Sequence, residues 1–214
     1  MRVGVVLPRP SDDPGEWLTD AVAFEAAGAD ALWVEHGAAP ALDPLTLTAA
    51  LAAVTYRSLL VVATVLDSGQ ARALATVERL SRGRLALIAA PEAAASEAAG
   101  SETVAPVIVA SEAAVPDAVP DAVPDAVAMD AAAGDSAVAV IVRLEDGSYR
   151  EGGSVGRWVP VGVPDGRVAW REVLRVAGER GDRGVLVPAD PRLLDLLRNP
   201  EDPGGRHDLQ LAQG

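Results

Sequence analysis

Short apolar runs alternate with helix-like segments along the first ninety residues. The runs are rich in Val, Leu and Ala and lie at 3–7, 31–34, 59–65 and 84–89. The run at 59–65 is continuous rather than alternating, which is typical of a parallel strand buried on both faces. Between the runs, apolar residues recur at helical spacing in 14–28, 43–54 and 68–81. This alternation predicts βαβ units and a parallel sheet.

Residues that favour helix ends stand at the borders of these segments. Asp12 and Asp13 are candidate N-caps before Pro14, and Gly28 stands where a glycine ends a helix. Asp43-Pro44 and Asp190-Pro191 each place a capping carboxylate before a proline in the first helical turn. Each pair predicts where a helix begins, and Asp190-Pro191 opens a short helix near the end of the chain.

The middle of the chain breaks this rhythm. Residues 115–126 repeat Val-Pro-Asp-Ala three times, and a proline at every fourth residue excludes an α-helix or a central strand there. We expect 91–136 to be an extended, low-complexity insertion, with 104–110 as a possible strand within it. We further expect one barrel domain over 1–199 and a polar tail over 200–214.

Regular structure resumes after the insertion. Strand-like runs at 137–144 and 155–163 flank the turn sequence Glu145-Asp146-Gly147-Ser148, which predicts an antiparallel hairpin. A helix is predicted over 167–180, followed by a final strand at 184–188. The fold class expected is therefore α/β, with mostly parallel strands and a partly antiparallel middle.

Composition excludes several kinds of function. All 18 basic residues are arginines, and against 31 acidic residues they leave a net charge of −13. An acidic chain is repelled by nucleic acid and by anionic membranes, so neither is expected as a partner. The absence of cysteine excludes disulfides and thiolate metal sites, and no metal site is expected. No export or membrane-spanning segment is visible, which predicts a cytoplasmic protein.

Several segments resemble the bacterial luciferase-like monooxygenases. They are Leu7-Pro8, the run from Phe24 to His36, Asp43-Pro44-Leu45-Thr46, Ala49–Thr55 with Arg57, and Leu74–Arg84. The last of these is the most specific, since it resembles an Ala-Thr-Leu-Asp-Arg-Leu-Ser-Gly-Gly-Arg segment that precedes the fourth strand in that group. The resemblance covers about residues 1–90 and resumes more weakly over 157–198.

What the resemblance implies is a TIM-type (β/α) barrel, here shortened or incomplete. It further implies FMN or an 8-hydroxy-5-deazaflavin as cofactor, a small organic substrate and a homodimer. Chemistry in such barrels lies at the carboxyl ends of the strands. His36 is then the candidate catalytic acid or base, because an imidazole titrates near neutral pH. Candidate cofactor-binding residues are Pro8, Glu35, Ala63, Thr64 and Ala89.

Two alternatives stay open for the function. After the fourth strand the chain has Ala89-Ala90-Pro91-Glu92, where the resembling family has a glycine-rich turn that lets the backbone approach a ligand. No loop for a flavin phosphate can be identified, and Arg143, Arg157 and Arg167 are equal candidates for that contact. The chain is therefore interpreted either as a flavin-dependent oxidoreductase, or as a non-catalytic relative that acts as a binding or assembly partner. His36 is likewise either catalytic or an ordinary loop residue.

Overall fold

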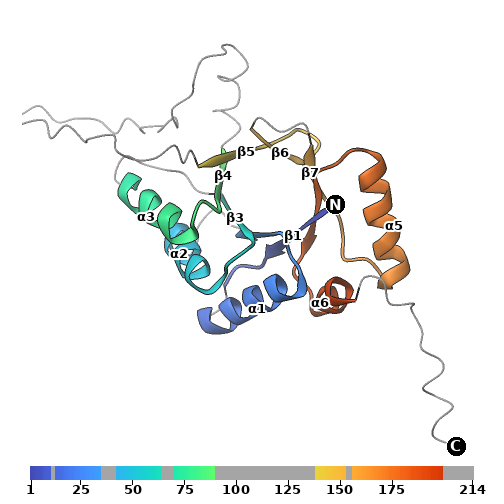
Figure 1. Cartoon of the computed structure of the whole chain (residues 1–214), viewed down its shortest axis with the longest axis horizontal. Helices are drawn as coiled ribbons and strands as arrows, with labels where there is room; N and C mark the ends of the chain where they lie inside the picture. The colour runs from blue at the N-terminus through green and yellow to red at the C-terminus, as the bar shows by residue number, and fades with distance from the viewer. Residues whose placement is uncertain (11–12, 35–41, 64–69, 90–137, 153–155, 200–214) are drawn as a thin grey trace, which may run out of the picture.

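Eight strands in the described residues close into a barrel (Figure 1). The computed structural model describes residues 1–10, 13–34, 42–63, 70–89, 138–152 and 156–199. The strands are β1 (Arg2–Leu7), β2 (Ala31–Val34), β3 (Leu59–Ala63), β4 (Leu85–Ala89), β5 (Ala139–Arg143), β6 (Tyr149–Glu151), β7 (Arg157–Pro160) and β8 (Gly184–Pro188). The α/β barrel class expected from the sequence is confirmed, and the barrel is closed rather than open. The expected insertion at 91–136 and the tail at 200–214 lie outside the described residues.

Helices surround much of this barrel (Figure 1). They are α1 (Pro14–Ala27), α2 (Pro44–Val54), α3 (Ala71–Ser81), α5 (Gly166–Glu179) and α6 (Pro191–Arg198). The expected caps are present: the Asp13 carboxylate accepts from the Gly15 N–H at 2.8 Å, and that of Asp43 accepts from the Thr46 N–H at 2.7 Å. Gly28 ends α1 in the left-handed region, with φ of 112°. In the described part of the chain, no helix is both long enough and apolar enough to cross a membrane.

One strand departs from the sequence prediction. The hairpin turn forms as expected, but β5 pairs antiparallel with β6 at Tyr149–Glu151, not with the 155–163 run. β6 pairs antiparallel with β7 in turn, and β7 then runs parallel to β8. The predicted two-strand pairing is wrong because a three-residue polar strand has too little alternation to be recognised. β6 is held in place by backbone pairing on both of its edges.

The strands bury apolar side chains on both faces. Outward residues such as Val5 and Leu7 pack with the helices in the larger cluster, together with Trp17, Phe24 and Leu51. The lumen holds a second cluster, made of Ala31, Trp33, Val61, Ala86, Ile141, Trp158 and Leu186, with Val6, Leu59, Ile88, Ala139 and Tyr149 packed against it. Two tryptophans thus fill much of the space inside the ring of strands, and the barrel has a solid interior.

Glycine makes this filling possible at the lower part of the lumen. A Cβ built on Gly184 lies 2.6 Å from Trp158 Cζ3 and 2.7 Å from the Arg2 carbonyl oxygen. The carbonyl belongs to the paired strand β1 and cannot move aside without disrupting the sheet. The lumen therefore accepts the Trp158 ring only because β8 begins with a residue that has no side chain.

We expect Gly184→Ala to lower the free energy of unfolding by about 1–3 kcal/mol, because overpacking forces shifts in a close-packed core. Gly162→Ala is the matched control, since a Cβ there meets nothing within 4 Å. Urea denaturation of the two variants and the wild type measures the difference. Equal stability of all three proteins would contradict the tight packing of Trp158 against β8.

Candidate functional site

The two ends of the barrel differ in the chemistry of their residues. β1 to β5 are mutually parallel, and β7 and β8 run in the same direction, so their carboxyl ends form one rim. β6 runs the opposite way and contributes its first residue, Tyr149, to that rim. We call this rim, together with the upper part of the lumen, the mouth. In barrels of parallel strands, loops at this end carry the chemistry.

The sequence-predicted site residues fall at this rim as far as they are described. Pro8 follows β1 and is exposed, and its carbonyl accepts a hydrogen bond from Trp17 Nε1 at 2.8 Å. Ala63 and Ala89 are the last residues of β3 and β4. His36, Glu35 and Thr64 lie outside the described residues, so their roles stay predictions.

The floor of the mouth is aromatic. Trp33, the third residue of β2, lies in the lumen with 4% of its surface exposed. Its ring contacts Tyr149 edge to face, with centroids 4.9 Å apart, and Trp158 in the same manner at 6.0 Å. Edge-to-face pairs at these separations are attractive beyond the area that they bury. Trp33 is therefore fixed from two sides and closes the lumen beneath the mouth.

Arg143 adds a positive charge beside this floor. It ends β5 and pairs directly with Tyr149 on β6, which places both side chains on the same face of the sheet. Its guanidinium carbon lies 6.0 Å from the centroid of the Tyr149 ring, within the range of a cation–π contact. The site predicted from sequence contained none of Trp33, Tyr149 and Arg143. Only the pairing of β5 with the unexpected strand β6 brings them together.

The opposite end of the barrel holds a buried polar network. The Glu25 carboxylate accepts hydrogen bonds from the N–H groups of Tyr56, Arg57 and Ser58, at 2.7, 2.9 and 2.8 Å. Arg84 donates to the carbonyls of Ser58 and Thr55, at 2.8 Å each. These residues join the end of α1 to the segments that enter β3 and β4.

Two opposing effects set the pKa of Glu25. Burial raises the pKa, and the hydrogen bonds from the Ser58, Arg57 and Tyr56 backbone outweigh burial, so the pKa lies below its ordinary value of 4.5. Burial also lowers the pKa of Arg84, against the favourable charge of Glu25. Both groups are held charged at neutral pH and have no access to the mouth. We assign this network to stability rather than to chemistry.

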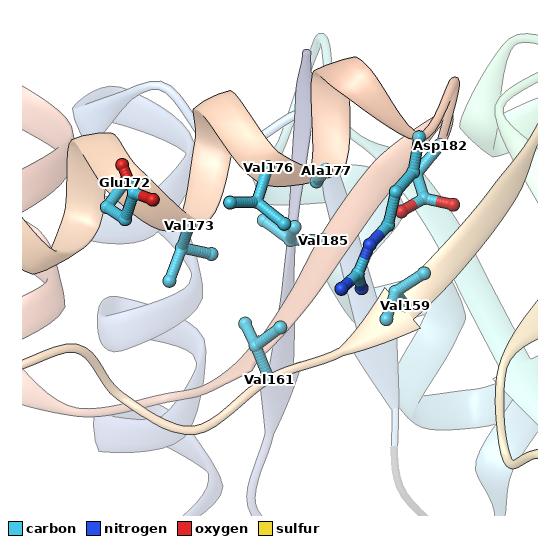
Figure 2. Close-up of a pocket in the computed structure, with 9 residues that line it drawn as sticks. Val159, Val161, Glu172, Val173, Val176, Ala177, Asp182 and Val185 are labelled. Atoms are coloured by element: carbon cyan, nitrogen blue, oxygen red, sulfur yellow. The ribbon is translucent and has the colours of Figure 1, made fainter.

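A cleft also lies outside the barrel (Figure 2). It has a volume of about 200 Å³ and lies between α5 and the strands β7 and β8, with walls formed by Val159, Val161, Val173, Val176 and Val185. Glu172 at one end pairs with Arg175, and Asp182 at the other pairs with Arg157. The walls are apolar, and Glu172 and Asp182 at the two ends are each paired with an arginine.

Comparisons with known proteins add little to this geometry. No family model matches the sequence, and no curated protein matches it. One solved structure that matches is EDTA monooxygenase (EmoA) from Chelativorans sp. BNC1, at 20% identity and a TM-score of 0.35. The match covers 48% of this chain and 32% of that one, so this chain spans about a third of its length. At that TM-score the match says nothing about what this chain binds.

Metal chemistry has no support among the described residues. No group of three or more acidic or histidine side chains in those ranges is arranged to hold a metal ion. Asp190, at the rim, caps α6 through the Arg192 N–H at 2.8 Å and also pairs with the Arg192 side chain. Its hydrogen bonds with Arg192 lower the pKa of Asp190, which suits a capping role. Among the described residues, the mouth thus has an aromatic floor, with Arg143 beside it.

Proposed function

We propose that this chain is a luciferase-like oxidoreductase with a TIM-type barrel, which binds FMN or an 8-hydroxy-5-deazaflavin at the mouth. The observation that carries the proposal is the aromatic floor at the carboxyl ends of the strands. Trp33 and Tyr149 lie at the same end as Pro8 and Ala63, the positions at which the luciferase-like resemblance expects the cofactor. A fold by itself does not establish a function. The support for the proposal is that aromatic side chains lie at the end of the barrel where the resemblance expects the cofactor.

The aromatic and apolar character of the described mouth residues supports binding of the ring system of such a cofactor. A planar tricycle needs a flat apolar surface, and Trp33, Tyr149 and Ile88 provide apolar groups packed with the lumen cluster. After β4 the sequence has Ala90 and Pro91 where the resembling family has a glycine-rich turn. The support is therefore for the ring, and Arg143 adds a cation beside Tyr149.

Each residue of the mouth has a distinct role in this proposal. The bound flavin supplies the two-electron redox chemistry. Trp33 and Tyr149 exclude water beneath the ring, and Thr64 holds the ring edge. His36 donates or accepts the proton that accompanies electron transfer, for which its pKa near neutrality is suitable. Glu35, which precedes it in the sequence, contributes to cofactor binding.

Flavin titration tests the proposal. We expect FMN or the deazaflavin, in the oxidised or reduced form, to bind with a Kd of about 1–10 µM, measured by fluorescence and calorimetry. His36→Ala and Thr64→Ala should each weaken binding about tenfold, or about 1.4 kcal/mol. His207→Ala, the other histidine, and Thr19→Ala, an exposed threonine of α1, are the matched controls. No binding of any of the four forms at about 100 µM would overturn the proposal.

The alternative is a non-catalytic relative that acts as an assembly partner. The observation in its favour is the sequence after β4, where Ala90 and Pro91 replace the glycines of the resembling family. A homodimer is expected in either case, and sedimentation equilibrium measures it. A dimer that binds none of the four cofactor forms would favour the assembly role.

A further inference from the structure

Arg143 combines two features: it ends β5 at the rim of the mouth, and it has no carboxylate partner among the described residues. Arg157, Arg167 and Arg183 each form an ion pair within 3.1 Å. Arg143, which is exposed at the end of β5, forms no ion pair with any residue of the described ranges. In a chain with a net charge of −13, the described part of the rim thus carries a cation that no described carboxylate pairs with.

The neighbours of Arg143 restrict where its guanidinium can lie. It faces the Tyr149 ring at 6.0 Å, and that ring is itself held by Trp33 at 4.9 Å. Ile141, two residues earlier on β5, is fully buried in the lumen, so Arg143 shares the inward face of its strand. A guanidinium above an aromatic face keeps its N–H donors free in its own plane. The donors are therefore available to a ligand in the mouth.

We propose that Arg143 and Tyr149 form a subsite for the anionic group of a planar organic substrate, a carboxylate or a phosphate. The Arg143 fork binds two oxygens of the anion through parallel hydrogen bonds, while the planar part of the substrate lies against Tyr149, which Trp33 supports from beneath. The inference rests on the proposed function in that it uses the same mouth and names the class of substrate. A cofactor phosphate carries the same chemistry as a substrate anion, and the experiment separates the two sources.

Benzoate and benzamide are suitable probes because they have the same shape and differ in charge. Titration of each into the full-length protein is followed by the Trp33 indole N–H signal in ¹H–¹⁵N spectra, assigned with a Trp33→Phe variant. We expect benzoate to bind at least tenfold more tightly than benzamide. Arg143→Gln should lower benzoate affinity about 10- to 100-fold and leave benzamide unchanged, as for loss of a charged hydrogen-bond partner.

Control variants and a second pair of ligands make the outcome decisive. Arg150→Gln removes an exposed arginine from the next strand and should leave benzoate affinity unchanged. Arg143→Lys keeps the charge without the fork and should recover part of the affinity. Thermal melting of each variant confirms that it folds. Equal binding of benzoate and benzamide, or equal effects of Arg143→Gln and Arg150→Gln, would overturn the inference.

FMN carries a phosphate and riboflavin does not. The effects of Arg143→Gln on the binding of the two flavins and of benzoate therefore show whether the subsite takes the cofactor phosphate or a substrate anion. If Arg143→Gln weakens FMN but not benzoate, the subsite belongs to the cofactor phosphate, and the substrate assignment is wrong. If benzoate binding depends on Arg143 while no flavin binds, the subsite stands and the oxidoreductase proposal fails. The expected result is that Arg143→Gln leaves flavin binding unaffected and weakens benzoate binding about 10- to 100-fold.

Discussion

Replacing Glu25 with alanine is expected to lower the free energy of unfolding by about 3–5 kcal/mol, as for removal of one partner from a buried charged network. The Glu25 side chain is buried and accepts from three consecutive backbone N–H groups, at Tyr56, Arg57 and Ser58. Alanine leaves those donors without an acceptor in a place that water reaches poorly. The nearby Arg84 also loses the negative charge that offsets its burial.

Two variants and a pH series test this expectation by urea denaturation. Glu25→Gln keeps one carbonyl oxygen as an acceptor and should cost less than Glu25→Ala. Asp20→Ala removes an exposed acidic residue from the same helix and should change stability by less than about 0.5 kcal/mol. Equal losses for Glu25→Ala and Asp20→Ala would show that the network contributes nothing.

The pH dependence follows from the direction of the Glu25 pKa. Because the pKa is lower in the folded than in the unfolded protein, the unfolded state binds the proton first as pH falls. The stabilisation is complete above the unfolded value near 4.5 and is lost as pH falls below it, through the folded pKa. Glu25→Gln should therefore lose the part of the acid sensitivity that Glu25 contributes. A wild type and variant with parallel stability curves below pH 4.5 would contradict the assignment.

The buried network around Glu25 is built from residues in the segments that resemble luciferase-like proteins. Glu25, Arg57 and Arg84 lie in the segments that resemble luciferase-like proteins, and the structure brings them together at the end of the barrel opposite the mouth. The Arg57 side chain donates to the Glu25 carbonyl at 2.9 Å. These residues tie the end of α1 to the segments that enter β3 and β4, which is a structural role. They carry no information about a substrate, which is why the function needs its own evidence from the mouth.

Local signals made much of the fold predictable. Asp13, Asp43 and Asp190 cap the helices that their sequences predicted, because a carboxylate before a proline satisfies free N–H groups wherever it occurs. The apolar runs were recognisable as buried strands because a short continuous apolar run is typical of a strand covered on both faces. A run that is apolar on both faces has no alternation, however, and cannot reveal which residues face the lumen.

The mouth was less predictable because it depends on contacts between distant segments. Trp33 was visible only as part of an apolar run, and its partner Tyr149 lies 116 residues later, in a strand too short to predict. Arg143 was one of three equal candidates for an anion contact. The register between β5 and β6 places Arg143 opposite Tyr149. That register is set by the pairing of the strands and not by any local sequence pattern.

Trp158→Ala is expected to lower the free energy of unfolding by about 3–5 kcal/mol, as Glu25→Ala does. Removal of a large aromatic side chain leaves a cavity that the surrounding barrel cannot fill. Trp158 is fully buried against Gly184, and its ring supports Trp33 at 6.0 Å. Urea denaturation measures the loss. Val168→Ala, which trims a side chain that is 70% exposed, should change stability by less than about 0.5 kcal/mol.

A second substitution separates the shape of the Trp158 ring from its polar atom. The Trp158 indole N–H has no hydrogen-bond partner among the described residues, and an unpaired buried donor is costly. Trp158→Phe removes that donor while it keeps most of the ring, so it should cost less than Trp158→Ala. Because Trp158 supports the floor of the mouth, Trp158→Ala should also broaden the Trp33 indole signal and weaken benzoate binding, even where the variant remains folded. Unchanged benzoate affinity in folded Trp158→Ala protein would mean that the mouth does not depend on the packing beneath it.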